Sequence, residues 1–121
     1  MGERIGRILH IRGDDAAAGH IGRGSYPLGI PSGLHWSVEE GVLLQGESLV
    51  LYSDGLMEAR GVHDQEYGYE RAEQLFSSWH RASAQGLLSA LLEDWNGYVA
   101  GRPIDDDVSV AVIRKRTSVL L

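Results

Sequence analysis

The first residue that could do chemistry is Asp54, which follows the short apolar segment 49–52 and precedes Gly55. A strand end is a rigid position, and glycine lets the backbone turn sharply away from it. The pattern therefore predicts a carboxylate aimed from the end of a buried strand. Asp-Gly is also a common turn pair, so an ordinary strand-to-turn transition explains these residues as well.

A second acidic group, Asp105 to Asp107, stands immediately before the apolar segment 108–113. Adjacent like charges repel, so they must be solvated or neutralised by a cation. If segments 49–52 and 108–113 are antiparallel neighbours, Asp54 and the triplet meet at one edge of the sheet. Carboxylates without cysteine or paired histidine favour a hard divalent cation, Mg²⁺ or Mn²⁺. A solvated acidic loop is the alternative interpretation of the triplet.

Other candidates for chemistry are weaker. The five histidines show no metal-ligand spacing. Ser53 precedes the acid, but no histidine or lysine is placed to activate it as a nucleophile. We therefore expect no catalytic side chain beyond the metal centre.

The elements that must position these acids form a simple order along the chain. Strands are predicted over 4–11, 36–44, 49–52 and 108–113, and the segment 19–33, rich in glycine and proline, is predicted to be a loop. Two amphipathic helices lie between the last two strands. Helices that are grouped together favour an α+β fold, with an antiparallel sheet and the two helices packed on one face.

The two helices are predicted from apolar residues spaced three and four apart. The first carries Tyr69 and Phe76, and the second begins after an N-cap at Ser83 and stops near Gly101. Trp79 and Trp95 fall on the apolar faces, and we expect both in the core.

Composition limits the classes of partner. The chain of 121 residues is the size of one domain, here taken as residues 1–121, and its formal net charge is −6. An acidic chain argues against nucleic acid and anionic membranes, which both need clustered cations. The absence of cysteine fits a reducing compartment. No apolar run is long enough to span a bilayer and no signal peptide is evident, so the sequence predicts a cytoplasmic location without membrane contact.

The segment "GESLVLYSDGLMEARGVHDQEYGYERAEQLF" resembles the C-terminal half of the PPM-type metal-dependent protein serine/threonine phosphatases, in their bacterial SpoIIE-like branch. The branch is typified by a Thr-Asp-Gly that leads to Glu-Ala-Arg, then by Tyr-Gly or Phe-Gly before a helix. It closes with Asp-Asp-Asp and a final strand. Here Ser53 stands in place of the usual threonine.

The resemblance implies that Asp54 and Asp106 are metal ligands, with Gly55 and Asp107 as their neighbours. It also implies an α-β-β-α sandwich of two antiparallel sheets that holds two Mn²⁺ or Mg²⁺ ions. In such enzymes a metal-activated water hydrolyses phosphoserine or phosphothreonine. The implied partner is a phosphorylated regulatory protein, such as an anti-sigma-factor antagonist.

The sequence departs from the family in one serious respect, because the Gly-Asp-x-x-Asp motif whose acid bridges the two metals is absent. We therefore expect this chain to be the C-terminal half of a phosphatase domain with part of the active site. The isolated chain should be inactive or weakly active, and it should bind divalent metal only weakly. The alternative is a non-catalytic interaction module that pairs, with itself as one option, through an uncovered sheet edge or helix face.

Overall fold

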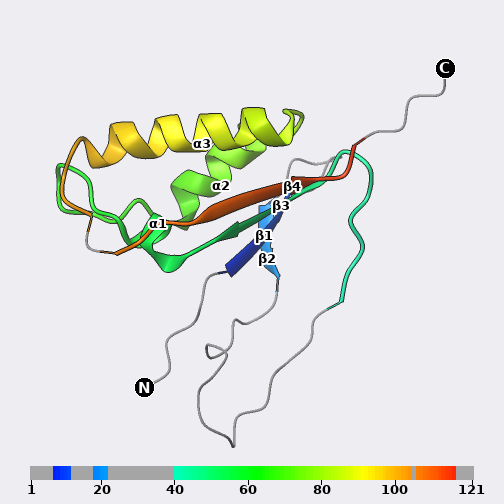
Figure 1. Ribbon diagram of the computed structural model, residues 1–121, viewed down its shortest axis with the longest axis horizontal. Helices are drawn as coiled ribbons and strands as arrows, with labels where there is room; N and C mark the ends of the chain where they lie inside the picture. The colour runs from blue at the N-terminus through cyan, green and yellow to red at the C-terminus, as the bar shows by residue number, and fades with distance from the viewer. Residues whose placement is uncertain (1–6, 12–17, 22–39, 105, 117–121) are drawn as a thin grey trace, which may run out of the picture.

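The computed structural model describes residues 7–11, 18–21, 40–104 and 106–116. It contains four strands, β1 (Arg7–Ile11), β2 (Ala18–Ile21), β3 (Ser48–Tyr52) and β4 (Val110–Arg114). Three helices, α1 (Asp54–Glu58), α2 (Tyr69–Ser78) and α3 (Ala84–Val99), separate β3 from β4 along the chain. Figure 1 shows α2 and α3 lying along the sheet, with α1 at the end of β3.

The strands form one sheet in the order β2-β1-β3-β4, and all neighbours are antiparallel. The predicted α+β fold, with an antiparallel sheet and two amphipathic helices on one face, is confirmed. The predicted pairing of the strand before Asp54 with the strand after the acidic triplet is also confirmed, since Tyr52 lies opposite Val110.

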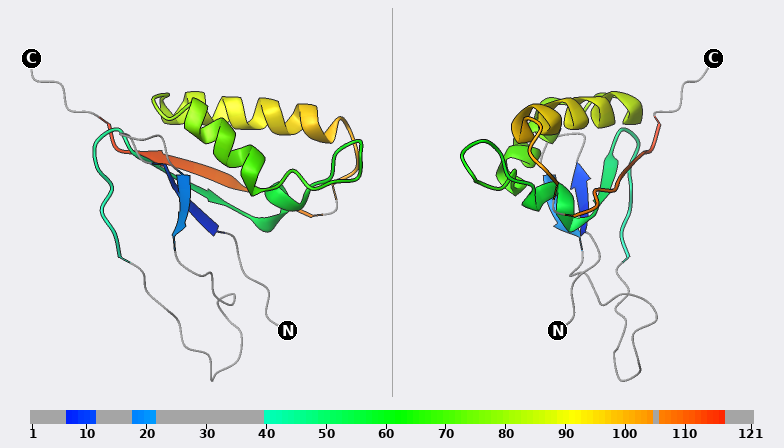
Figure 2. Two further views of the ribbon diagram at one scale, coloured as in Figure 1. Left: turned by 180° about the vertical axis from the view of Figure 1, so that it is seen from behind. Right: turned by 60° about the vertical axis from the view of Figure 1, so that its left-hand side comes forward.

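One face of the sheet packs under the helices (Figure 2). Side chains alternate between the two faces of a strand, and in β3 the buried positions are Ser48, Val50 and Tyr52. Val50 and Tyr52 belong to a single buried cluster with residues of all three helices, including Leu56, Phe76 and Leu91. The helices are therefore held by burial of apolar surface against this face.

The opposite face of the sheet carries a second set of apolar side chains. Leu49 lies opposite Ile113 and Leu51 lies opposite Ala111. Ala111 and Ile113 are exposed, and Ile113 retains 50% of its accessible surface. None of the three described helices covers this face (Figure 2). We call these four residues the outer sheet face.

Helix α3 begins as the sequence predicts. The backbone N–H of Gly86 donates to Oγ of Ser83 at 3.0 Å, so Ser83 is a true N-cap. The helix ends where Ala100 and Gly101 both adopt positive φ, at 49° and 79°. In the described part of the chain no helix has the length and apolarity to cross a membrane.

Two predicted elements are corrected by the structure. The predicted strand 36–44 is wrong over its described part, because residues 40–44 form no strand and Val42 is 73% exposed. The predicted loop is also wrong over residues 19–21, because residues 18–21 form β2, an edge strand that pairs with β1. The loop assignment over 22–33 and residues 4–6 of the first predicted strand lie outside the described residues.

The environment of Trp79 also differs from the prediction. Trp79 is 45% exposed, whereas Trp95 is 5% exposed and lies in the core as expected. Helix α2 ends at Ser78, and Trp79 is its C-cap with φ −110° and ψ 18°. Trp79 instead lines a pocket together with Ala90 and Gly97 of α3, which leaves it half-exposed.

Candidate metal site

The candidate site lies where β3 ends and β4 is about to begin. Ser53 connects the two strands at this point. Its backbone N–H donates to the carbonyl of Ser109 at 2.9 Å, and its Oγ accepts the N–H of Ser109 at 2.9 Å. The Ser53 hydroxyl donates to the backbone carbonyl of Asp107 at 3.2 Å. These bonds fix the segment that carries Asp106 and Asp107 beside the segment that carries Asp54.

Asp54 is the first residue of α1 and is partly buried. The sequence predicts a turn here, and the structure instead forms a five-residue helix. A helix this short is not stable alone. It is held by burial of Leu56 and Met57 in the core. The direction of Asp54 is therefore set by packing in the neighbouring turn.

Gly55 is required by a close approach of two backbone segments. A Cβ atom at Gly55 would overlap the carbonyl oxygen of Asp107 and lie 3.2 Å from its carbonyl carbon. It would also meet Cγ2 of Val108 at 3.4 Å. Only glycine lets α1 and the segment before β4 lie this close, so Gly55 brings the two acidic segments together.

Asp106 and Asp107 are both exposed at this edge. Oδ1 of Asp106 accepts the backbone N–H of Asp107 at 2.8 Å, which orients the Asp106 carboxylate. Asp105, the first acid of the triplet, lies outside the described residues. The structure thus places Asp54, Asp106 and Asp107 on two segments that are bonded to each other at one sheet edge.

A pocket of about 400 Å³ adjoins this edge. Its walls come from α1, the following turn, the end of α3 and the connection to β4. Gly55, Val99, Arg102, Ile104 and Asp106 are among the lining residues. Arg102 supports the wall, since its guanidinium donates to the carbonyl of Gly61 at 2.6 Å and to Asp64 Oδ1 at 3.1 Å. The edge with the acids therefore opens onto a space with both apolar and charged walls.

The donor chemistry at the edge fits a hard divalent cation, because every candidate ligand is a carboxylate oxygen. The number of ligands is smaller than such an ion needs. Across residues 7–11, 18–21, 40–104 and 106–116, no three His, Cys, Asp or Glu side chains are grouped so that they could hold a metal ion. About six oxygens surround Mg²⁺ or Mn²⁺, so the described part of the chain offers an incomplete set.

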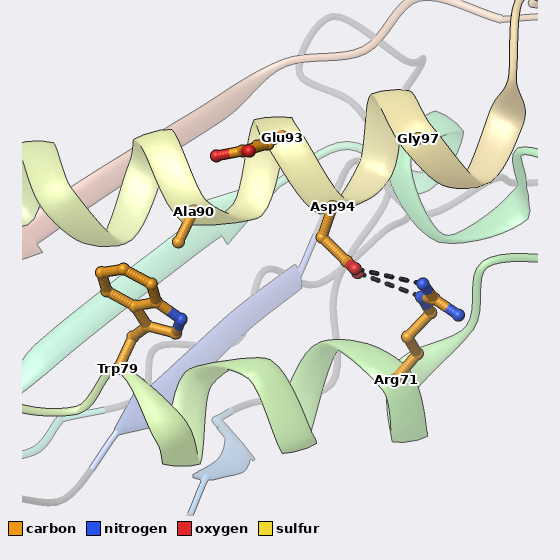
Figure 3. A pocket seen from close by; sticks show the side chains of 6 residues that line it. All are labelled: Arg71, Trp79, Ala90, Glu93, Asp94 and Gly97. Carbon is orange, nitrogen blue, oxygen red and sulfur yellow. Dashed lines mark hydrogen bonds and ion pairs between the residues drawn. The ribbon is translucent and has the colours of Figure 1, made fainter.

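A second pocket, of about 440 Å³, lies between α2 and α3 and away from the acids. Figure 3 shows Trp79 at one end and the Arg71–Asp94 ion pair at the other. Arg71 donates to both oxygens of Asp94, at 3.0 and 3.1 Å. The guanidinium also lies 4.7 Å from the ring centre of Tyr98. This arrangement ties the two helices together.

The same pair shifts the pKa values of its members. Hydrogen bonding by Arg71 holds the pKa of Asp94 below its usual value, with a further contribution from the Tyr67 hydroxyl. That hydroxyl donates to Asp94 at 2.7 Å. Burial, followed by the bond to Asp94, raises the pKa of Tyr67 well above 10. These shifts belong to a structural brace that no local sequence pattern predicts, because Asp94 lies 27 positions from Tyr67 and 23 from Arg71.

The fold agrees with a comparison to solved structures. The structure is similar to the SiaA-PP2C domain of Pseudomonas aeruginosa, with a TM-score of 0.75 over 92% of this chain and 17% sequence identity. This likeness assigns the fold to the PP2C class. The chain covers 43% of that solved domain, so it spans less than half of its length.

The family follows from the sequence. The profile of the family described as Stage II sporulation protein E (SpoIIE) matches residues 6–116. The chain therefore belongs to the SpoIIE family, and the resemblance to SpoIIE-like phosphatases of the PPM type is confirmed. The comparison with curated proteins gave no match.

Proposed function

We propose that this chain forms the C-terminal half of a phosphatase domain that hydrolyses phosphoserine or phosphothreonine on a regulatory protein. Membership of the SpoIIE family and the PP2C-type fold support a phosphatase function in general. The observation that carries the proposal is the pairing of β3 with β4, which puts Asp54 and Asp106 on bonded segments at one sheet edge.

In this proposal Asp54 and Asp106 hold Mn²⁺ or Mg²⁺, and Gly55 and Asp107 shape the site beside them. A bound divalent ion lowers the pKa of a coordinated water and offsets charge on the phosphoryl oxygens. The chain's own contribution is to hold two carboxylates at a fixed edge. Ser53 fixes the spacing of the two segments, and Gly55 permits their close approach.

The remaining ligands have to come from elsewhere in the complete enzyme. The described residues do not complete a metal shell, and the chain covers less than half of the solved PP2C domain. We therefore expect little or no turnover from the 121-residue chain. The proposed substrate is a phosphorylated regulator such as an anti-sigma-factor antagonist, on the strength of the family resemblance alone.

The test is release of phosphate from a phosphoserine protein by the longer protein that contains this chain, with and without MnCl₂. The expected result is activity that depends on Mn²⁺ and is abolished by Asp54→Asn and Asp106→Asn together. Glu70→Gln together with Glu93→Gln is the matched control, because it also removes two carboxylates, both of them exposed on α2 and α3. Retention of activity by the double variant would refute the assignment of the ligands.

A second candidate function is a non-catalytic interaction module, and the outer sheet face favours it. Ile113 and Ala111 are exposed on an edge strand, beside Leu49 and Leu51. Apolar surface on an open sheet edge promotes association. If this is the whole function, Ile113→Lys should abolish self-association of the chain in analytical ultracentrifugation while leaving its helical content unchanged. A chain that is monomeric before the substitution would exclude the self-pairing form of this module.

A further inference from the structure

The orientation of Asp54 depends on α1, and α1 in turn contacts α3. Helix α1 has only five residues, and the last four carbonyl groups of any helix lack a partner within it. In α1 those carbonyls belong to residues 55–58. Unpaired buried carbonyls are costly, so donors from other elements must satisfy them.

One such donor is the indole of Trp95. Its Nε1–H donates to the carbonyl oxygen of Leu56 at 2.8 Å, in a buried bond between residues 39 positions apart. Trp95 is 5% exposed and Leu56 is fully buried. A second donor is the backbone N–H of Gly68, which reaches the carbonyl of Met57 at 3.0 Å. Of these two bonds, only the one from Trp95 comes from a long helix.

The bond therefore ties α1 to the most extensive helix of the fold. Helix α3 runs over 16 residues and packs on the sheet through Leu87, Leu91 and Val99 as well as Trp95. Figure 1 shows the C-terminal end of α3 above α1, while its N-terminal end lies farther along the sheet. The Trp95 side chain of α3 therefore holds α1 in place through this hydrogen bond.

Few contacts separate Trp95 from the candidate ligand Asp54. Leu56 is two residues after Asp54 in the same helix turn, and its carbonyl cannot move without moving that turn. On the other side, Gly55 lies against the backbone of Asp107, so α1 is clamped between α3 and the segment with the second acid. A shift of α1 would change the separation of the two carboxylates.

We infer that Trp95 is a positioning residue for the metal site, and that it acts through its hydrogen bond to Leu56 and not merely as a core side chain. The inference rests on the proposed function only for the identity of Asp54 as a ligand. Loss of the indole N–H should release α1 and weaken divalent-cation binding at Asp54, while the rest of the fold persists.

The experiment uses the 121-residue chain labelled with ¹⁵N. Trp95→Phe keeps an aromatic ring but removes the N–H donor. Hydrogen exchange of the amides in residues 54–58 is measured by NMR, and Mn²⁺ is titrated while paramagnetic broadening is followed at Asp54, Gly55 and Asp107. In Trp95→Phe the α1 amides should exchange faster relative to those of α3, and the Mn²⁺ concentration for half-maximal broadening should rise about two- to tenfold.

Two controls separate positioning from general stability. Trp79→Phe makes the same change at a half-exposed tryptophan, and it should alter neither readout. Leu87→Ala weakens the core at the other end of α3, eight residues or about 12 Å from Trp95, and should not loosen α1 selectively. Equal loosening of α1 by Leu87→Ala and Trp95→Phe would overturn the inference, as would a folded Trp95→Phe with unchanged exchange in α1.

The unmodified protein provides a test that does not depend on how well a variant folds. If the bond holds α1, the Trp95 indole N–H should be protected to the same degree as the α1 amides, since both are released by the same opening. A freely exchanging indole would contradict the inference. Failure of Asp54→Asn to reduce Mn²⁺ broadening would instead contradict the proposed function, and the exchange results would still decide the role of Trp95.

Discussion

Ser53 and Ser109 bond to each other twice across the end of the β3–β4 pair. The backbone N–H of Ser53 donates to the carbonyl of Ser109, and the N–H of Ser109 donates to the hydroxyl oxygen of Ser53, both at 2.9 Å. The serine before the acid is therefore structural. The Ser53 hydroxyl takes the place of a backbone carbonyl in the hydrogen bonding between β3 and β4, at the point where the two strands diverge toward Asp54 and Asp107.

Removal of the Ser53 hydroxyl should lower the stability of the fold, whereas a threonine at this position should preserve it. Ser53→Ala loses the two hydrogen bonds of the hydroxyl, to the Ser109 N–H and the Asp107 carbonyl, and keeps the backbone bond to Ser109. We expect the free energy of unfolding to fall by about 1 kcal/mol. Ser53→Thr keeps the hydroxyl and should stay close to the original protein. Urea unfolding followed by circular dichroism measures both. A Ser53→Thr variant as unstable as Ser53→Ala would show that the hydroxyl is not what matters.

Gly55 and Gly97 give a matched pair of glycine substitutions. Gly55→Ala forces a methyl group against the Asp107 backbone, so it should destabilise the fold by about 1–3 kcal/mol. Gly97 lies inside α3, where a Cβ meets nothing within 4 Å. Gly97→Ala should therefore stabilise by about 0.5–1 kcal/mol through helix propensity. Thermal unfolding of the two variants should shift in opposite directions, and a Gly55→Ala protein as stable as the parent would contradict the close approach.

The Arg71–Asp94 pair predicts a specific pH dependence. The pKa of Asp94 is lowered in the folded state, so the pair adds stability at pH values above the ordinary aspartate pKa of 3.8. That contribution is lost as the pH falls through the lowered folded value. Because both side chains are partly exposed, we expect Asp94→Asn to cost no more than about 1 kcal/mol near pH 7. The difference in melting temperature between Asp94→Asn and the parent should shrink below pH 4, and a constant difference from pH 7 to pH 3 would refute this origin.

Metal binding by the chain should be weak. With too few described carboxylates to fill six positions, we expect a dissociation constant on the order of millimolar for Mn²⁺. Calorimetric titration with MnCl₂ measures it directly. Two tight stoichiometric sites would show that the chain completes the metal centre by itself.

The sequence predicts best where one rule governs a long segment. The apolar spacing of residues 69–79 and 87–99 indicates α2 and α3, and Ser83 marks the start of α3. The meeting of the two acidic segments follows from strand order together with the direction of pairing. That step needs only the assumption that the strands are antiparallel neighbours, which the structure confirms.

The sequence fails where tertiary contacts decide. Helix α1 is too short to show periodicity, and its existence depends on the core and on the indole of Trp95. Strand β2 contains alanine and glycine, and its definition comes from pairing with β1. The brace of Tyr67, Arg71 and Asp94 joins residues up to 27 positions apart and leaves no local pattern.

The order of the elements also bears on how the protein folds. Strands β3 and β4 are neighbours in the sheet, yet all three helices lie between them in sequence, and Ser53 meets Ser109 across 56 positions. A contact that closes so large a loop has a high entropic cost and is expected to form late, whereas α2 and α3 form early from local contacts. We expect the carboxylate edge to assemble after the rate-limiting step, so Ser53→Ala should speed unfolding and leave the refolding rate nearly unchanged in stopped-flow measurements. A slowed refolding limb would instead place this edge in the folding nucleus. On this pathway Asp54 and Asp106 stay apart until the last stage of folding, so the candidate cation site exists only in the native state.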